Sequence, residues 1–376
     1  MKLGDVISVA NTEKCGNRTF PVLSMTMHDG LILQTDRFKK TIASKDLSNY
    51  KVVRRNQLVV SFPIDEGVLY IQDVTNAGIV SPAYAVWDVD TKIVRPRFLG
   101  MFLRCPMCIL HYKAKLRGST ARRRTIPRED FLAMKIPTFT ITEQDRICLV
   151  LEKIESVIKT SGKQMQLLQH LVKSRFVEMF GENQEWERVG LLDVGKCKNG
   201  INFAPNECGY EIHCIGVGNF KDFAEISNVE STPLVSLSQR PSDDLLLRDG
   251  DMLFVRSNGN KSLVGRCVVV RPGDTEVTFS GFCIRYRVTL EKLDPFYLVH
   301  FLRQSQVRRL LQGRGANIQN MSQRTLAGLT IPLPPLALQR EFAAFVAKVD
   351  KLAFAARKRR DAAKQLYRAK IQEFFG

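Results

Sequence analysis

The sequence predicts an α+β chain in which two similar mixed α/β domains with short strands are joined by two long antiparallel coiled-coil helices in a pseudo-two-fold arrangement. The first observation is a gap-free internal repeat at an offset of 195 residues. Ile136-Pro137 recurs as Ile331-Pro332, and Gln144 recurs as Gln339. Solenoid repeats have periods of about 20–50 residues, so this period indicates duplication of a whole domain with its helix. The second observation is a heptad-like apolar pattern after each Ile-Pro pair.

The repeat divides the 376 residues of the chain into four segments. We expect a first domain at 1–135, a first spacer helix at 136–181, a second domain at 182–330 and a second spacer helix at 331–376. The same order of domain and helix occurs twice, so the chain should carry two equivalent surfaces.

Each predicted helix opens with an Ile-Pro turn, where proline costs little because the first amides have no intrahelical partner. Thr142 is the expected cap of the first helix, and Ser161-Gly162 is the place where that helix could bend or break. Apolar residues then recur at spacings of three, four and seven, which fit a heptad seam. The side chains predicted to pair one helix with the other are Ile147, Leu151, Ile154, Ile158, Leu168, Val346, Val349 and Tyr367.

The two domains show matching elements in the same order. A strand at 58–61 matches a strand at 252–255, and the short buried helix expected around Phe98 matches the one expected around Tyr297. Side chains outside these positions share little. A retained scaffold with different surfaces is what two modules that recognise different targets would show.

Composition favours a reduced intracellular protein with a polyanionic partner. The net charge is +18 at pH 7, with 44% hydrophobic and 25% charged residues, and this charge favours nucleic acid over membrane. No apolar run approaches the roughly 18 residues of a membrane span, and the N-terminus lacks a signal pattern. The nine cysteines have no framework spacing and indicate free thiols. We therefore expect a cytoplasmic location.

With these features, the chain resembles the specificity (S) subunit of type I restriction–modification systems. The likeness is carried by the segment from Ile331-Pro332 to Leu336 with Gln339 and the helix that follows, by its internal partner Ile136-Pro137 with Gln144, and by Asp249-Gly250-Asp251 before a strand. Each motif alone is short. Their order, spacing and duplication cover essentially the whole chain, as target recognition domain 1, spacer helix, target recognition domain 2 and spacer helix.

The resemblance implies a non-catalytic DNA-recognition subunit. Each recognition domain would read one block of a split double-stranded DNA site, and the paired helices would fix the spacer between the blocks. Two methyltransferase (M) subunits would supply S-adenosylmethionine and methylate adenine N6. Restriction (R) subunits would supply ATP- and Mg²⁺-dependent translocation and cleavage. No cofactor, metal or membrane contact is expected for this chain itself.

Elementary DNA geometry agrees with a split site. One turn of B-DNA is roughly 34 Å, so two modules on a rod of comparable length can reach the same face of the duplex one turn apart. Because the two modules differ in sequence, the two half-sites should differ, which gives an asymmetric target.

The expected DNA contacts lie in two equivalent loops, 118–124 and 313–320, in a polar loop at 256–261 and at several basic positions. Glycine allows close approach to phosphate, while Arg, Asn and Gln can read guanine and adenine edges; a solvated basic turn or an ordinary hairpin turn is the plain alternative for each loop. Paired basic residues are expected at phosphates rather than at bases. The predicted DNA-binding residues are Lys39, Lys40, Arg54, Arg55, Ser119, Thr120, Arg122, Arg123, Arg124, Arg256, Asn258, Lys261, Arg308, Arg309, Arg314, Asn317, Gln319 and Asn320.

The motifs that resemble catalytic or metal-binding sites are incomplete. Asp294-Pro295-Phe296 lacks the second proline of the adenine methyltransferase tetrapeptide and is interpreted as a turn before a helix. Cys105 and Cys108 form a lone CxxC and are interpreted as buried thiols on an apolar helix. There is no Walker loop. The alternatives are a coiled-coil scaffold with a duplicated domain and, less favoured, a self-sufficient methyltransferase or nuclease.

Overall fold

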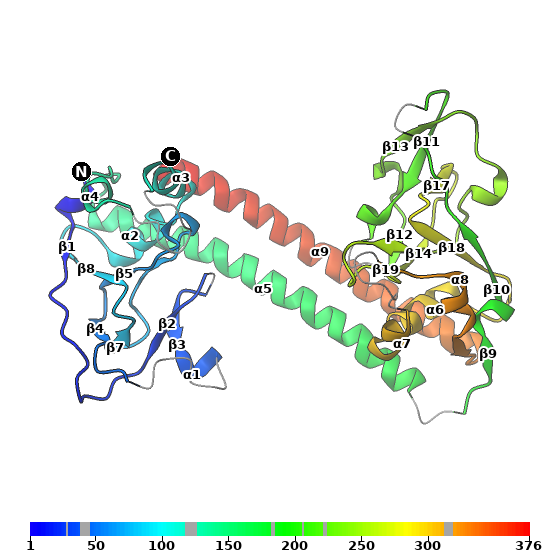
Figure 1. The fold of residues 1–376 in the computed structure, drawn as a ribbon, viewed down its shortest axis with the longest axis horizontal. Helices are drawn as coiled ribbons and strands as arrows, with labels where there is room; N and C mark the ends of the chain where they lie inside the picture. Colours follow the sequence, from blue (N-terminus) through cyan, green and yellow to red (C-terminus); the bar gives the residue numbers. More distant parts are fainter. Residues whose placement is uncertain are drawn as a thin grey trace. The chain divides into compact units, whose positions relative to one another are not determined.

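The computed structural model of the chain describes residues 1–27, 29–37, 46–116, 126–181, 185–204, 207–220, 224–311 and 319–376. It divides into two compact units. Unit 1 comprises 1–162 together with 357–376, and unit 2 comprises 163–356. Two long helices, α5 (Ile141–Phe180) and α9 (Leu336–Phe375), each contribute to both units (Figure 1).

Helices α5 and α9 each contain 40 residues and lie within the predicted segments 136–181 and 331–376. The expected cap at Thr142 is wrong, because α5 begins one residue earlier. Thr140 is the cap: its Oγ1 accepts from the Glu143 amide at 3.3 Å, and its own amide donates to Glu143 Oε2 at 2.7 Å. This reciprocal pair is a capping box. Helix α5 also continues without interruption through Ser161 and Gly162.

Unit 1 contains a four-stranded antiparallel sheet in the order β1-β8-β5-β6 and two separate strand pairs, β2–β3 and β4–β7. Short helices cover the sheet. The strands are β1 (Ile7–Val9), β2 (Leu23–Met25), β3 (Leu31–Leu33), β4 (Lys51–Arg54), β5 (Leu58–Val60), β6 (Leu69–Ile71), β7 (Ala77–Val80) and β8 (Ala85–Val89); the helices are α1 (Gln34–Arg37), α2 (Pro96–Phe102), α3 (Pro106–Lys115) and α4 (Arg128–Leu132).

The core of unit 1 joins this sheet to both long helices. Ile147 and Leu151 from α5 and Phe375 from α9 belong to the same buried cluster as the apolar side chains of α2 and α3. Phe375 makes edge-to-face contacts with Phe98 and Phe102 at ring distances of 5.4 and 5.6 Å. Such aromatic pairs contribute about 0.5–1.5 kcal/mol beyond area burial, so the last turn of α9 is an integral part of this core.

Unit 2 contains a five-stranded sheet in the order β10-β18-β14-β16-β12 and a three-stranded sheet in the order β13-β11-β17, with two strand pairs, β9–β20 and β15–β19. The strands are β9 (Arg188–Gly190), β10 (Gly195–Asn199), β11 (Tyr210–Ile215), β12 (Glu225–Ile226), β13 (Leu234–Leu237), β14 (Met252–Val255), β15 (Ser257–Asn258), β16 (Cys267–Val270), β17 (Val277–Phe279), β18 (Cys283–Val288), β19 (Gln319–Asn320) and β20 (Thr330–Pro332); the helices are α6 (Pro295–Leu302), α7 (Ser305–Leu310) and α8 (Gln323–Ala327).

The core of unit 2 is again shared by a sheet, a short helix and the two long helices. Phe176 and Phe180 from α5, Tyr297 from α6 and Phe342 from α9 form an aromatic cluster with ring distances of 4.8–5.8 Å. The segment before α6 confirms the interpretation of Asp294 as part of a turn. Its carboxylate caps α6 by accepting from the Phe296 amide at 2.7 Å and from the Tyr297 amide.

The helices contact each other within each unit. In unit 1, Tyr367 of α9 donates to Glu155 of α5 at 2.7 Å, and in unit 2, Arg175 of α5 pairs with Glu341 of α9 at 3.0 Å. An early residue of one helix thus meets a late residue of the other, which is the antiparallel order. None of the helices among the described residues is long and apolar enough to cross a membrane.

The two units repeat one strand register. In unit 1, Leu58 of β5 pairs with Trp87 of β8; in unit 2, Met252 of β14 pairs with Tyr286 of β18. The strand order β1-β8-β5-β6 therefore corresponds to β10-β18-β14-β16. The duplication of a scaffold with short strands, predicted from the sequence, is confirmed at the level of individual residue pairs.

A buried glutamine attaches each long helix to its domain, and we call this arrangement the glutamine clamp. Gln144 Oε1 accepts from the Arg95 amide at 2.7 Å, and its Nε2 donates to the carbonyls of Ile93 and Phe139 at 3.1 and 3.0 Å. Gln144 and its repeat partner Gln339 are 2% and 0% exposed, so water cannot replace these bonds.

Gln339 makes the corresponding three bonds in unit 2. Its Oε1 accepts from the Asp294 amide at 2.8 Å, and its Nε2 donates to the carbonyls of Lys292 and Pro334 at 2.9 and 2.7 Å. In both units the amide bonded to the glutamine belongs to the residue that precedes a short helix, α2 or α6. The clamp therefore fixes where that short helix begins against the first turn of the long helix.

Replacing Gln339 by Leu should lower the free energy of unfolding of unit 2 by about 3 kcal/mol, because the buried amide is lost and three backbone groups lose their partner at about 1–3 kcal/mol each. Denaturant unfolding of the full chain measures the change. The matched control is Gln169→Leu, since Gln169 is exposed on α5 and should change stability by less than about 0.5 kcal/mol. Equal effects of the two substitutions would contradict the clamp.

Candidate nucleic-acid interface

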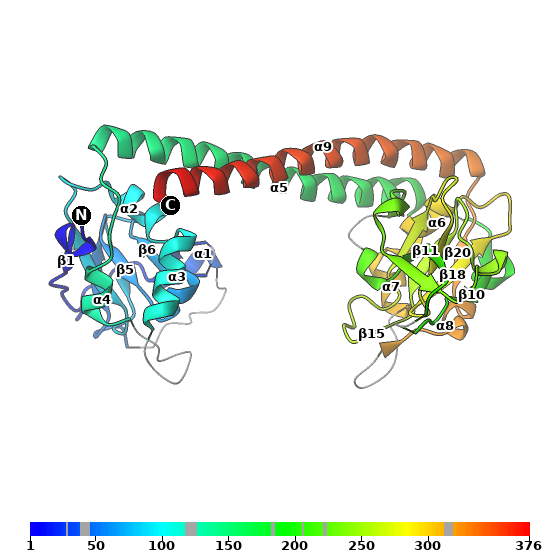
Figure 2. The ribbon, with the colours of Figure 1, turned by 90° about the horizontal axis from the view of Figure 1, so that it is seen from above.

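Two sequence-distant segments predicted to contact DNA are brought together in unit 2. Strand β15, just after the buried strand β14, pairs antiparallel with β19, so that Ser257 faces Asn320 and Asn258 faces Gln319. A further bond from the Met321 amide to the Arg256 carbonyl, 2.8 Å long, extends this pairing. Figure 2 shows β15 at the side of unit 2 remote from α9. The predicted loop at 256–261 and the end of the predicted loop at 313–320 thus form one surface, here called the β15–β19 surface.

Arg308 anchors the segment that directly follows the 256–261 loop of this surface. Its guanidinium donates to the carbonyl oxygens of Val264, Ser262 and Leu263 at 2.6, 2.9 and 3.4 Å, and burial lowers its pKa. Gly265 makes the approach possible: its φ is +72°, and a Cβ there would lie 2.8 Å from Arg308 Nη1. The predicted phosphate contact at Arg308 is thus a residue whose charge is already engaged with three carbonyls directly after the loop.

The other predicted side chains of unit 2 are placed around this loop. Lys261 and Arg309 are exposed, and Arg309 donates from Nε to the Ser305 carbonyl at 3.3 Å. Asn258 is half-buried and its Oδ1 accepts from the Asn260 amide at 2.8 Å, which shapes the turn. Arg256 reaches the Gly281 carbonyl at 3.4 Å. Lys261 and Arg309 therefore offer exposed charge, while Arg256, Asn258 and Arg308 shape the loop.

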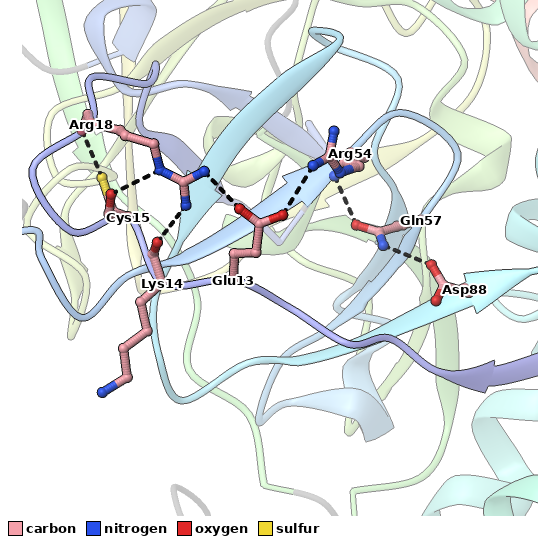
Figure 3. Close-up of polar contacts among 7 residues, drawn as sticks. All are labelled: Glu13, Lys14, Cys15, Arg18, Arg54, Gln57 and Asp88. Carbon is pink, nitrogen blue, oxygen red and sulfur yellow. Dashed lines mark hydrogen bonds and ion pairs between the residues drawn. The ribbon is translucent and has the colours of Figure 1, made fainter.

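In unit 1, the predicted contact Arg54 lies in a polar network on β4 (Figure 3). Glu13 accepts from Arg18 at 2.6 Å and from Arg54 at 3.2 Å. These hydrogen bonds, with Arg18 the larger, lower the pKa of the Glu13 carboxyl. The Arg54 side chain stays 66% exposed, so Glu13 orients the two guanidinium groups without covering them. Arg55 donates to Asn76 Oδ1 at 3.4 Å.

Of the predicted DNA contacts, Gln319 is described only through its backbone. Nine others lie outside the described residues: Lys39, Lys40, Ser119, Thr120, Arg122, Arg123, Arg124, Arg314 and Asn317.

The predicted helix-pairing side chains all lie on buried or half-buried faces of α5 and α9. Ile147, Leu151 and Ile154 are at most 8% exposed, as are Val346 and Val349. The half-buried members of the set are Ile158, Leu168 and Tyr367.

Sequence reasoning missed the groups that hold the surface loops in place. The buried carboxylate of Asp251, 1% exposed, receives two 2.6 Å bonds from the Arg287 guanidinium and one from the Arg248 amide. The Arg18–Glu13–Arg54 network was also not foreseen, because ordinary charged residues 41 positions apart carry no local pattern. The sequence feature that could have indicated the buried carboxylate is Asp251 itself, in the motif Asp249-Gly250-Asp251.

Cys105 and Cys108 are buried at the start of α3, as interpreted from the sequence. Their sulfur atoms are 3.6 Å apart, and the hydrogen bond between the two side chains lowers the pKa of Cys105 to about 7. Among the described residues, no group of three or more His, Cys, Asp or Glu side chains has the arrangement of a metal site.

The duplicated register, the two long helices and the separate loop surface of unit 2 define a chain with the specificity-subunit fold. Residues 183–363 match the family model described as "Type I restriction modification DNA specificity domain". The resemblance drawn from the sequence is thereby confirmed.

Similar proteins carry corresponding names. The type I restriction enzyme MjaVIII specificity subunit of Methanocaldococcus jannaschii is 23% identical, over 88% of this chain and 81% of the relative. The type I restriction enzyme StySPI specificity subunit of Salmonella potsdam is 29% identical, over 44% of this chain and 35% of the relative.

Two solved structures share the fold. The type I restriction-modification system S subunit from M. genitalium matches with a TM-score of 0.62 at 11% identity, covering 100% of this chain and 95% of that one. A chain from a structure described as showing complex assembly and conformational transition of the type I R-M system matches with a TM-score of 0.57 at 17% identity, covering 100% and 96%.

Arg308→Met should loosen the β15–β19 surface, because the carbonyls of residues 262–264 lose their shared donor at about 1–3 kcal/mol. Hydrogen exchange at the amides of 257–264 should accelerate at least tenfold. Arg309→Met is the matched control: it removes an exposed charge and should leave exchange in this segment unchanged. If both variants exchange like the parent chain, Arg308 does not support the surface.

Proposed function

We propose that this chain is the DNA sequence-recognition subunit of a type I restriction–modification complex. The observation that supports this most strongly is the combination of a repeated register, with Leu58–Trp87 equivalent to Met252–Tyr286, and the match of residues 183–363 to a DNA specificity domain. One scaffold is used twice, with different loops. A scaffold role through coiled-coil pairing alone gives no reason for the duplicated loop-bearing domains.

The proposal assigns no reaction to this chain. Two methyltransferase subunits, carrying S-adenosylmethionine, would methylate adenine N6, and restriction subunits, carrying ATP and Mg²⁺, would translocate and cut DNA. Unit 1 would read one half-site and unit 2 the other. Basic side chains near the readers, such as Arg54, Lys261 and Arg309, would contact phosphates, since such contacts position a protein without reading sequence.

The two half-sites should be unequal. The β15–β19 surface of unit 2 carries Asn258, Gln319 and Asn320, whereas the described loops of unit 1 have no β-pair of this composition. The exposed amide side chain of Asn320 would be able to form paired hydrogen bonds with an adenine edge in the major groove. A target with two different blocks separated by a non-specific spacer follows from this difference.

The test is to co-express the chain with a type I methyltransferase subunit encoded beside it and to map N6-methyladenine in the host DNA. A split, asymmetric methylated motif is expected. A continuous motif, or a stable complex with methyltransferase that methylates no defined motif, would overturn the assignment. The control strain carries the methyltransferase subunit alone and should show no such motif.

The spacer should follow helix length. Inserting one turn, four residues or about 6 Å, into both α5 and α9 should lengthen the spacer by about two base pairs, at 3.4 Å per step, while both half-sites keep their bases. The insertion points are after Gly162 and after Ala356, where α5 and α9 pass from one unit to the other. Methylation mapping reads the result. Changed half-site bases with an unchanged spacer would refute the role of the helices as a ruler.

A further inference from the structure

The central strands β5 and β14 are each preceded by the same turn, at residues 54–57 in unit 1 and 248–251 in unit 2. In each turn the side chain of the last residue accepts from the amide of the first. Gln57 Oε1 accepts from Arg54 at 2.7 Å, and Asp251 Oδ2 accepts from Arg248 at 2.8 Å. The last amide donates back to the first carbonyl, at 3.2 Å in unit 1 and 3.0 Å in unit 2. The duplication has therefore kept this turn bond for bond.

The turn does not need an arginine at its first position. That residue contributes a backbone amide and a backbone carbonyl, which every residue except proline can supply. The third position does have a requirement, because its φ lies in the left-handed region, at 72° for Asn56 and 87° for Gly250, and two different residue types satisfy it. The first residue is nevertheless arginine in both units, and the side chains of Arg54 and Arg248 are both exposed.

The positions beside the turn have changed between the units. Val86 of β8 pairs with β5 as Arg285 of β18 pairs with β14, and two residues further along Asp88 corresponds to Arg287. An aliphatic and an acidic residue in unit 1 are thus both replaced by arginine in unit 2. An exposed arginine that is retained where its neighbours have changed indicates a partner outside the fold.

An ion pair within the chain does not explain the retained arginine. In unit 1, Arg54 shares the Glu13 carboxylate with Arg18 (Figure 3). Two guanidinium groups meet one carboxylate, so positive charge remains, and such exposed pairs contribute little to stability. In unit 2, Arg248 has no carboxylate partner among the residues that the structure describes.

Arg248 lies close to a group of basic side chains on one face of β10 and β18. The members on the strands are Lys196, Lys198, Arg285 and Arg287. Burial and the charge of Arg287 lower the pKa of Arg285, and the charge of Arg248 adds to this effect. Within the group, Asp251 is paired with Arg287, and Asp244 is paired with Lys198. Excess positive charge is left over, which suits an anionic partner.

A partner that meets Arg54 in one unit and Arg248 in the other must present the same chemistry to both. Under the proposed function, the two half-sites differ in their bases but share the sugar–phosphate backbone. A methyltransferase subunit would be a second partner common to both units. The excess positive charge around Arg248, and the two guanidinium groups on one carboxylate in unit 1, favour the phosphates.

We propose that Arg54 and Arg248 are equivalent contacts to the DNA backbone, each binding one phosphate beside the half-site that its unit reads. This inference rests on the proposed function. A guanidinium group can donate two parallel hydrogen bonds to a phosphate. Phosphate contacts position a protein without reading sequence, so one retained residue serves two units whose reading loops differ. Arg248 was not among the contacts predicted from the sequence.

The test uses the full chain in complex with a type I methyltransferase subunit and a duplex that contains the methylated motif. The logarithm of the binding constant falls linearly with the logarithm of salt concentration, with a slope set by the number of phosphates contacted. Arg54→Gln and Arg248→Gln should each reduce the magnitude of this slope by about 0.9, and the double variant should reduce it by about 1.8. The methylated bases should not change.

Lys92→Gln is the matched control. Lys92 is exposed, and its equivalent in unit 2 is Glu291, because Gln144 and Gln339 bond to the carbonyls of the residues that follow them, Ile93 and Lys292. The control removes one positive charge from a position where the charge is not retained. The salt slope should stay at the parent value.

Two further readouts separate a phosphate contact from a structural role. Arg248→Lys keeps the charge and should restore the parent slope. A methylphosphonate removes the charge from the DNA instead. One such substitution beside each half-site should weaken binding by the parent complex, and the Arg248→Gln complex should be insensitive to one of the two.

Unchanged slopes in variants with the parent melting temperature would overturn the proposal. Weaker assembly with the methyltransferase subunit at an unchanged slope would assign the arginines to that subunit, and would overturn it as well. Failure of the proposed function has a different signature: the parent complex would bind duplex without sequence preference. The slopes measured on any duplex would then still decide whether the two arginines contact phosphates.

Discussion

The glutamine clamp is the interaction on which the rest of each unit depends. Gln144 and Gln339 are buried near the start of α5 and α9, and each satisfies one backbone amide and two backbone carbonyls. An apolar residue at either position would leave those groups unpaired away from water. The bonds join the first turn of a long helix to the start of α2 or α6, and those short helices pack on the sheet that carries the loops. The position of each loop surface thus follows from the helix to which it is attached.

A scaffold fixed in this way allows the surface side chains to change without loss of the fold. The paired positions Trp87 and Tyr286 illustrate this. Both are buried and both pair with equivalent strand positions, Leu58 and Met252, yet Tyr286 bonds to Leu191 while Trp87 borders a pocket. Likewise, in unit 2 Arg308 donates to the carbonyls of residues 262–264 and so holds that segment in place. In unit 1, Glu13 orients Arg18 and Arg54. We expect function in such a chain to reside in loops that polar side chains hold in place, as is common for binding surfaces.

Long-range periodicity made much of the fold predictable. The repeat of Ile136-Pro137 and Gln144, and the heptad spacing after it, gave both long helices to within a few residues. Their caps were less predictable: Thr140 and Thr142 are both capable caps, and the choice depends on Glu143, whose carboxylate reaches back to Thr140. The described surface was harder still. β15 and β19 are two-residue strands without alternation, so nothing local indicated their pairing, and Arg308 looked like a phosphate contact because sequence does not show that carbonyls surround it.

Backbone-cleavage footprinting of DNA bound by this chain together with a type I methyltransferase subunit tests the central claim most directly. Two separate protected blocks of unequal sequence are predicted, with the Arg309→Met variant weakening protection in one block only, because Arg309 belongs to unit 2. A single continuous block, or equal weakening of both blocks, would contradict the account of two independent recognition units on one repeated scaffold.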